Sequence, residues 1–224
     1  MSFEAEQSRF DDLYWPGTDV LRNLLGIRDQ DELAATEVMT VAAQLTELPD
    51  LEISWPGFLD CHRHLFGPLY SWAGETRTFP MLKTGADLGD TGGAIVHDRM
   101  IHYSEWSQLP ATGKAFFDQL HNFNPIVDNE DFGTRAGWLA GGLNRLHPFR
   151  EGNGRTISTF LTHWSTTEGY PVDFNAWPRR QWTHARYAAY DSDFSVMHDG
   201  VMAALKHQRM PWSSRSNPQA GSGL

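Results

Sequence analysis

Apolar residues recur at intervals of three or four positions along most of the chain, which is the spacing of an amphipathic helix. In one such stretch Leu33, Val41 and Leu45 share a face, and Asp29 or Asp31 can cap the helix that carries them. The pattern predicts helices over 18–25, 31–48, 57–69, 94–108, 114–123, 129–143, 156–167, 178–190 and 194–206.

The helical spacing is interrupted once, in an aromatic and β-branched stretch over residues 70–79 that runs into a glycine-rich segment over 83–93. A short β-hairpin near 77–86 fits this change of pattern. The sequence has no internal repeat and no convincing linker between domains. We therefore expect an all-α fold with one small hairpin, forming a single domain over 14–208.

The two ends of the chain differ in composition from the rest. Residues 1–13 are of mixed polarity and predict an N-terminal arm, and residues 209–224, rich in Ser, Gly, Asn and Pro, predict a disordered tail. The N-terminus is acidic and lacks the layout of a signal peptide, and no apolar run is long enough to cross a membrane. We expect a cytoplasmic protein with no membrane partner.

Composition narrows the function classes. A hydrophobic content of 40%, with nine Trp and thirteen Phe among 224 residues, indicates a folded globular protein. The only cysteine, Cys61, excludes an internal disulfide and favours an intracellular compartment. A net charge of −10 argues against direct nucleic-acid binding, which requires a basic surface.

The strongest chemical signal lies in nine consecutive residues, His-Pro-Phe-Arg-Glu-Gly-Asn-Gly-Arg over 147–155. They join two predicted helices by a glycine-containing loop, so the orphan N–H groups and the dipole of the second helix form an anion site. Arg155 can hold a phosphate bidentately, and Glu151 in the same place makes sense as a Mg²⁺ ligand. His147 adds a proton acceptor that works near neutral pH.

The stretch resembles the signature of the Fic family, His-Pro-Phe-x-Asp/Glu-Gly-Asn-Gly-Arg-x-x-Arg. The resemblance covers roughly 14–205 and implies a Fic-type helical domain with a β-hairpin flap, which transfers AMP from ATP to a hydroxyl of another protein. It makes His147 the base, Glu151 the ligand of Mg²⁺, and Gly152, Asn153, Gly154 and Arg155 the groups that bind the nucleotide.

Two further segments are similar to family features. Tyr70-x-Trp-Ala-Gly-x-x-Arg77 resembles the approach to the Fic flap, which docks the target protein as an added strand. This implies a target-docking flap with Phe79, Met81 and Leu82, beside which Lys83 is expected to contact the nucleotide. Tyr190, in a segment similar to one that borders the nucleotide base, is expected to bind it too.

The chain departs from the signature at its last position, where Ser158 stands instead of the second arginine. In the family that guanidinium reaches the γ-phosphate, and losing a charge-assisted contact costs roughly 1.5–3 kcal/mol. Arg179, Arg180 and Arg186 are cations that could replace it, and the sequence does not choose among them.

The departure leaves alternatives open. One is a Fic-like transferase with another donor, such as UTP, or one moving phosphate or phosphocholine, and another is a degenerate fold that serves as a binding module.

The family's inhibitory motif requires a Ser or Thr four residues before a glutamate that is followed by Gly or Asn. Two glutamates in the chain are followed by Gly or Asn, Glu151 and Glu168, and neither has a Ser or Thr at that distance. This implies a small antitoxin acting in trans. The segment over 16–27 is similar to bacterial Fic toxins that act on type II topoisomerases, so DNA gyrase and topoisomerase IV are the expected targets.

Overall fold

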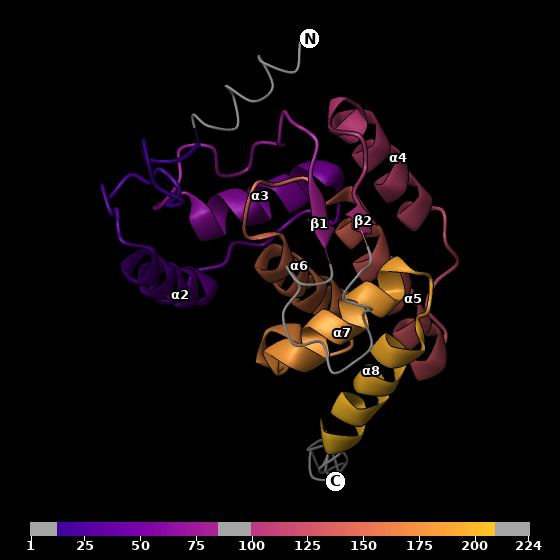
Figure 1. Ribbon diagram of the computed structural model, residues 1–224. Coiled ribbons are helices and arrows are strands. Elements are labelled where there is room, and N and C mark those ends of the chain that lie inside the picture. Colours follow the sequence, from indigo (N-terminus) through magenta and orange to yellow (C-terminus); the bar gives the residue numbers. More distant parts are fainter. Residues whose placement is uncertain (1–12, 85–99, 209–224) are drawn as a thin grey trace, which may run out of the picture.

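The computed structural model describes residues 13–84 and 100–208, and these form a helical domain (Figure 1). The predicted arm over 1–13 falls outside this part except for Leu13, and the predicted tail over 209–224 falls wholly outside it. The helices are α2 (Gln30–Thr46), α3 (Trp55–Phe66), α4 (Leu109–His121), α5 (Asn129–Leu146), α6 (Asn153–Thr167), α7 (Arg179–Tyr190) and α8 (Ser195–Gln208). Two short 3₁₀ turns, η2 (Trp106–Gln108) and η3 (Phe174–Ala176), lie between them.

Helix α5 is the centre of the packing, with α4, α6, α7 and α8 against it. Its glycines recur every four residues at Gly133, Gly137 and Gly141, so a narrow strip along the helix has no side chains. A Cβ added to Gly141 would lie 2.2 Å from the carbonyl oxygen of Ala189 in α7, and one added to Gly137 would lie 2.8 Å from Cβ of Phe194. The backbone of Ala189 at Gly141 and the side chain of Phe194 at Gly137 therefore leave no room for a side chain at these positions.

A cluster of phenylalanines joins the predicted loop to the core. Phe149 lies 5.5 Å from Phe58 of α3, ring centroid to centroid, and Phe58 in turn contacts Phe160 of α6 and Phe117 of α4. Phe58, Phe149 and Phe160 are completely buried. Burial of an aromatic side chain stabilises the fold by about 1.5–3 kcal/mol, so the loop that carries Phe149 is anchored where three helices meet.

Local sequence signals place most helices correctly. Asp29 caps α2 by accepting from the N–H groups of Asp31 and Glu32, and Asp128 caps α5 by accepting from Asp131. Helices therefore lie close to the stretches predicted at 31–48, 57–69, 114–123, 129–143, 156–167, 178–190 and 194–206.

The helix predicted over 18–25 is wrong. That segment is a set of turns in which Tyr14 forms an isolated bridge with Leu21. The side chain of Asn23 donates to the carbonyls of Leu21 and Ile27 and accepts from the N–H of Ile27. These local bonds satisfy the backbone without a helix, which is how asparagine competes with helical structure.

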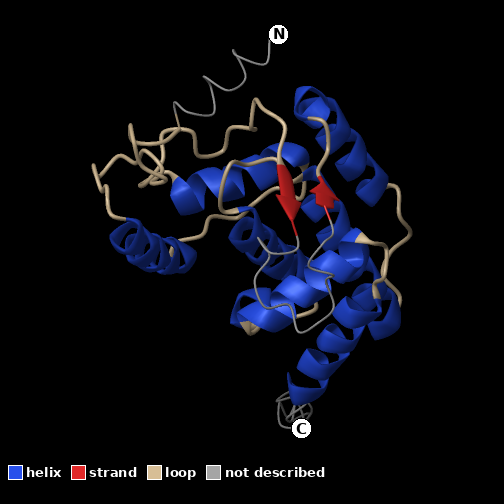
Figure 2. Cartoon of the chain, in the orientation of Figure 1, coloured by secondary structure: helices blue, strands red, loops and turns tan. Residues whose placement is uncertain are grey.

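The second error concerns the helix predicted over 94–108 and the hairpin near 77–86. Strand β1 (Leu82–Thr84) pairs antiparallel with β2 (Met100–His102), so its partner lies well beyond residue 86 (Figure 2). Within 94–108, the described residues form β2 and η2 rather than a helix. A small two-stranded sheet therefore exists beside the helices, and the residues joining its strands, 85–99, lie outside the described part.

Replacing Gly141 by Ala should destabilise the domain, because the new methyl group would meet the Ala189 carbonyl oxygen at 2.2 Å and push α5 away from α7. We expect the free energy of unfolding to fall by about 1–3 kcal/mol, measured by chemical denaturation. Thr134→Ala, at an exposed position of the same helix, is the control and should change it by less than about 0.5 kcal/mol. A Gly141→Ala protein as stable as the wild type would contradict the close packing.

Candidate active site

The loop between α5 and α6 changes direction through two residues with left-handed backbone. His147 ends α5 with φ of 42°, and Gly152 precedes α6 with φ of 79°. A Cβ on Gly152 would lie 2.5 Å from the ring of Phe66, so both the backbone angle and the close approach require glycine. The N–H groups of the first turn of α6 therefore face the loop as an anion site.

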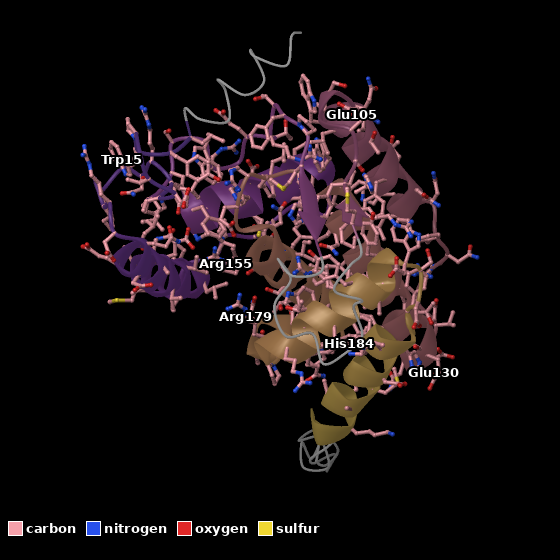
Figure 3. All side chains as sticks on the ribbon, viewed as in Figure 1. Trp15, Glu105, Glu130, Arg155, Arg179 and His184 are labelled. Atoms are coloured by element: carbon pink, nitrogen blue, oxygen red, sulfur yellow. The ribbon has the colours of Figure 1, made fainter. Side chains whose placement is uncertain are left out.

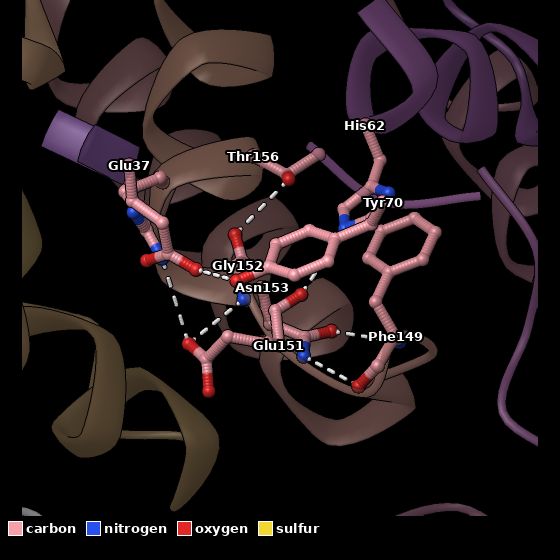
Figure 4. Close-up of polar contacts among 9 residues, drawn as sticks. Glu37, His62, Tyr70, Phe149, Glu151, Gly152, Asn153 and Thr156 are labelled. Atoms are coloured by element: carbon pink, nitrogen blue, oxygen red, sulfur yellow. Dashed lines mark hydrogen bonds and ion pairs between the residues drawn. The ribbon is translucent and has the colours of Figure 1, made fainter. Parts of the chain in front are cut away.

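Asn153 holds the loop in this shape. Its side-chain oxygen accepts from the N–H of Phe149 at 3.0 Å, and its amide donates to the carbonyl of the same residue at 2.7 Å (Figure 4). The side chain is buried and both of its ends are occupied. Of the groups expected to bind nucleotide, Asn153 can therefore offer its backbone N–H, while its side chain fixes the turn.

A neutral histidine supports the loop from α3. The Nε2 atom of His62 lies 3.1 Å from the carbonyl oxygen of Glu151, and its Nδ1 accepts from the N–H of Gly74 at 2.8 Å. The ring stacks on Phe149 with centroids 3.7 Å apart. These bonds require one proton on the ring, at Nε2, and burial lowers the pKa of His62 to about 3.

Arg77 connects the loop to the small sheet. Its buried guanidinium donates to the carbonyls of His147, at 2.9 Å, and Phe79, at 2.8 Å, and also to Ser104. Its backbone N–H donates to the carbonyl of Pro148 at 2.7 Å. One side chain thus fixes the backbone of the candidate base, the approach to β1 and the exit from β2.

The ring of His147 is held on its face by Tyr103, which follows β2. The two rings are stacked with centroids 3.7 Å apart and planes 14° apart. The hydroxyl of Tyr103 lies 2.9 Å from that of Tyr187 in α7. The orientation of the imidazole is therefore set by packing as well as by the backbone of the loop.

Arg155 forms ion pairs with two carboxylates. Its Nη2 lies 2.8 Å from Glu37 Oε2 of α2 and 3.6 Å from Glu151 Oε1. Tyr70 donates a hydrogen bond to the other oxygen of Glu37, and the Glu151 carboxylate also accepts from the N–H of Gly152 at 2.9 Å. The guanidinium is therefore oriented before any anion arrives.

These groups border one cavity of about 780 Å³, a size within the usual range for ligand pockets. Its wall includes the sequence-predicted His147, Glu151, Gly152, Asn153, Gly154 and Arg155. Arg155 and Arg179, both labelled in Figure 3, line it from α6 and α7. Several other lining residues could not be predicted from the motif, because they lie far from it in the chain: Tyr14, Glu37, Tyr70, Asn175 and Tyr187.

Other predicted site residues lie elsewhere. Tyr190 is not part of the cavity wall, and its hydroxyl donates to the carbonyl of His102 at the end of β2. Phe79 is buried beside Arg77, and Met81 is half-buried just before β1. Leu82 and Lys83 lie in β1, opposite His102 and Ile101, and their side chains fall outside the described part. Tyr190 thus holds the small sheet, whereas the docking role of the flap stays a prediction.

Glu151 is the residue that fits a Mg²⁺ ion shared with a nucleotide. Its side chain is 42% exposed and lines the cavity next to the anion site. Within 13–84 and 100–208, no group of three or more His, Cys, Asp or Glu could hold a metal by itself. Mg²⁺ commonly takes one or two protein carboxylates and completes its shell with phosphate oxygens and water, which matches this donor set.

Comparisons with known proteins agree with the geometry. The model of the Fic/DOC family matches residues 53–164. The chain is 31% identical over 191 residues to the probable protein adenylyltransferase y4lH of Sinorhizobium fredii, covering 84% of this chain and 92% of that protein. It is 33% identical over 188 residues to the protein adenylyltransferase VbhT of Bartonella schoenbuchensis. The matched residues make up 81% of this chain but only 36% of VbhT, which is much longer.

Among solved structures, the fold is similar to that of the BepC effector protein of Bartonella tribocorum with bound AMPPNP. The TM-score is 0.69 at 20% identity, covering 87% of this chain and 96% of that one. Among the residues that the structure describes, no helix has the length and apolar character needed to cross a membrane.

The stability of the domain should depend on pH through His62. The unfolded ring binds its proton near pH 6.5 and the folded ring only near pH 3, so acidification favours the unfolded state. Between these values the free energy of unfolding should fall by up to about 1.4 kcal/mol per pH unit from this group. Denaturation of wild type and His62→Gln at pH 7.5 and 4.5 measures the effect.

We expect His62→Gln to be less stable at pH 7.5, because it loses the ring stack, and to lose less stability on acidification. His102→Gln, at an exposed position of β2, should keep the wild-type slope. If His62→Gln retained that slope as well, the neutral buried ring would not be the cause.

Proposed function

Because the chain belongs to the Fic/DOC family, we propose that it transfers AMP from ATP to a hydroxyl side chain of a target protein. The observation that carries the proposal is that His147 lines the same cavity as the N-terminus of α6, Arg155 and Glu151. A base, an anion site and a carboxylate suited to Mg²⁺ are the groups that transfer of a nucleoside monophosphate requires. The names of y4lH and VbhT point to the same reaction.

In this reaction the oxygen of the acceptor hydroxyl attacks the α-phosphorus of ATP. A new P–O bond forms, the bond from the α-phosphorus to the bridging oxygen of the β-phosphate breaks, and pyrophosphate leaves. The hydroxyl proton passes to the imidazole of His147. The ring of Tyr103 stacks on this imidazole, and the guanidinium of Arg77 holds the backbone carbonyl of His147. A bound Mg²⁺ ion would neutralise charge on the phosphates next to Glu151.

The first turn of α6 stabilises the negative charge that develops on the phosphate oxygens. Backbone N–H groups there are fixed by the glycine at its start and by the Asn153 side chain, so they need not reorganise during the reaction. Arg155 adds a guanidinium whose direction Glu37 already sets. Loose phosphoryl-transfer transition states depend mainly on such positioning and charge neutralisation.

We also propose the finer role of a bacterial toxin that modifies DNA gyrase or topoisomerase IV in the cytoplasm and is restrained by a small antitoxin. The resemblance of residues 16–27 to such toxins supports the target, and the missing inhibitory motif supports control in trans. Incubation of purified gyrase and topoisomerase IV with the protein and α-labelled ATP tests it. The same incubation with a cell lysate is the second arm. If neither purified enzyme were labelled while lysate proteins were, the proposed target would be contradicted and the proposed reaction would stand.

His147→Ala should abolish transfer, because it removes the imidazole that takes the proton of the acceptor hydroxyl. The measurement is label passing from [α-³²P]ATP to lysate protein, with [γ-³²P]ATP as a negative control and unlabelled UTP as a competitor. A general base contributes typically about 10²–10⁴-fold to rate, so the residual signal should be at most a hundredth. His121→Ala, at an exposed position of α4, should remain active.

A chelator should stop the reaction, and added Mg²⁺ should restore it. If γ-label rather than α-label were transferred, the protein would move phosphate instead of AMP. A wild type that transfers nothing from any donor, yet binds Mg·ATP, would instead fit a binding module.

A further inference from the structure

Ser158 gives the cavity no positive charge. Its hydroxyl oxygen lies 2.7 Å from the side-chain oxygen of Asn175 and 3.0 Å from the carbonyl of Arg155. Thr159 adds a second hydroxyl, 3.2 Å from the same Asn175 oxygen. The position that carries an arginine in the family signature is therefore buried in a network of neutral groups, which cannot hold a phosphate as a cation does.

A different arginine reaches the anion site, from α7. Arg186 lines the cavity together with Gly154 and Ser158. A Cβ built on Gly154 would lie 3.2 Å from Nη1, 3.4 Å from Cζ and 3.5 Å from Nη2 of Arg186. The guanidinium therefore lies directly against the first turn of α6, where a residue larger than glycine would crowd it.

The guanidinium of Arg186 is buried without a counter-ion among the described residues. The residue is 9% exposed, and its Nε has no hydrogen-bond partner within that part of the chain. Its Nη1 donates to the neutral side-chain oxygen of Asn144 at 3.1 Å, and its Cζ lies 4.9 Å from the ring of Tyr187. A guanidinium has five N–H donors, and an uncompensated buried charge is destabilising, so this group is suited to an anion.

Arg155, unlike Arg186, has carboxylate partners among the described residues. It shares its charge with Glu37 and Glu151, whereas no described carboxylate pairs with Arg186. The two arginines also approach the N-terminus of α6 from different elements, since Arg155 contacts α2 and α3 while Arg186 contacts α5. Figure 1 shows α6 lying between α3 and α7.

We propose that Arg186 binds the phosphate chain of the nucleotide at the N-terminus of α6, in place of the cation missing at Ser158. This rests on the proposed function, because it assumes a nucleotide in the cavity. The two other candidate arginines of α7 are less suited. Arg179 lines the cavity but is exposed, and Arg180 is exposed and not part of the wall. A side chain already held by Asn144 and Tyr187 loses less conformational entropy on binding.

Calorimetric titration of the full chain with Mg·ATP, AMP and adenosine tests this. Arg186→Gln should weaken ATP binding by about 10- to 100-fold, the effect of losing a charge-assisted hydrogen bond, and should leave adenosine binding unchanged. Arg186→Lys should recover part of the ATP affinity. Arg180→Gln removes the same charge from the same helix outside the cavity, and should bind ATP like the wild type.

Four results would count against the assignment. Equal ATP affinity in wild type and Arg186→Gln would overturn it while leaving the proposed function standing. An equal loss for ATP and adenosine would show a structural effect, as would failure of both Arg186→Gln and Arg186→Lys to melt as folded proteins. A wild type that binds none of the three ligands would contradict the proposed function itself.

Discussion

The buried guanidinium of Arg77 is the contact on which the geometry of the site depends. It bonds the carbonyls of His147, Phe79 and Ser104, so the candidate base and the outer ends of both strands share one anchor. Burial lowers the pKa of Arg77 to about 10, which still leaves it charged at neutral pH. Without that side chain, three backbone carbonyls would lose a donor at once. The position of His147 is therefore coupled to that of the small sheet.

The helices could be predicted because their signals are local. Asp29 and Asp128 lie immediately before the helices that they cap, and Pro178 immediately precedes α7. The errors arose where a few contacts override the apolar spacing. Asn23 closes its turn with three side-chain bonds, and β2 offers three residues, of which Ile101 is buried. Alternation over three residues is too short to distinguish a strand from part of a helix.

The candidate site was predictable to the extent that it is contiguous. The residues from His147 to Arg155 carry the loop, the anion site and the carboxylate in one run of sequence. Their supports come from far away, since Glu37 is 118 positions from Arg155 and His62 is 89 from Glu151. Nothing near Glu37 in the sequence marks it as the partner of an arginine. The hydroxyl of Tyr190 likewise reaches the carbonyl of His102 in β2, a contact that only the fold brings about.

The charge of the protein explains why the site needs placed cations. With a net charge of −10, the long-range field does not attract a polyphosphate, so affinity must come from groups within contact distance. The N–H groups of α6 are one such source. Arg155 is a weaker one than its formal charge suggests, because Glu37 and Glu151 already neutralise part of it. Arg186 has no such neighbour among the described residues, so a phosphate gains more from it than from Arg155. In a site where Ser158 is neutral, affinity for the phosphate chain then depends on the guanidinium from α7 that we propose as its partner.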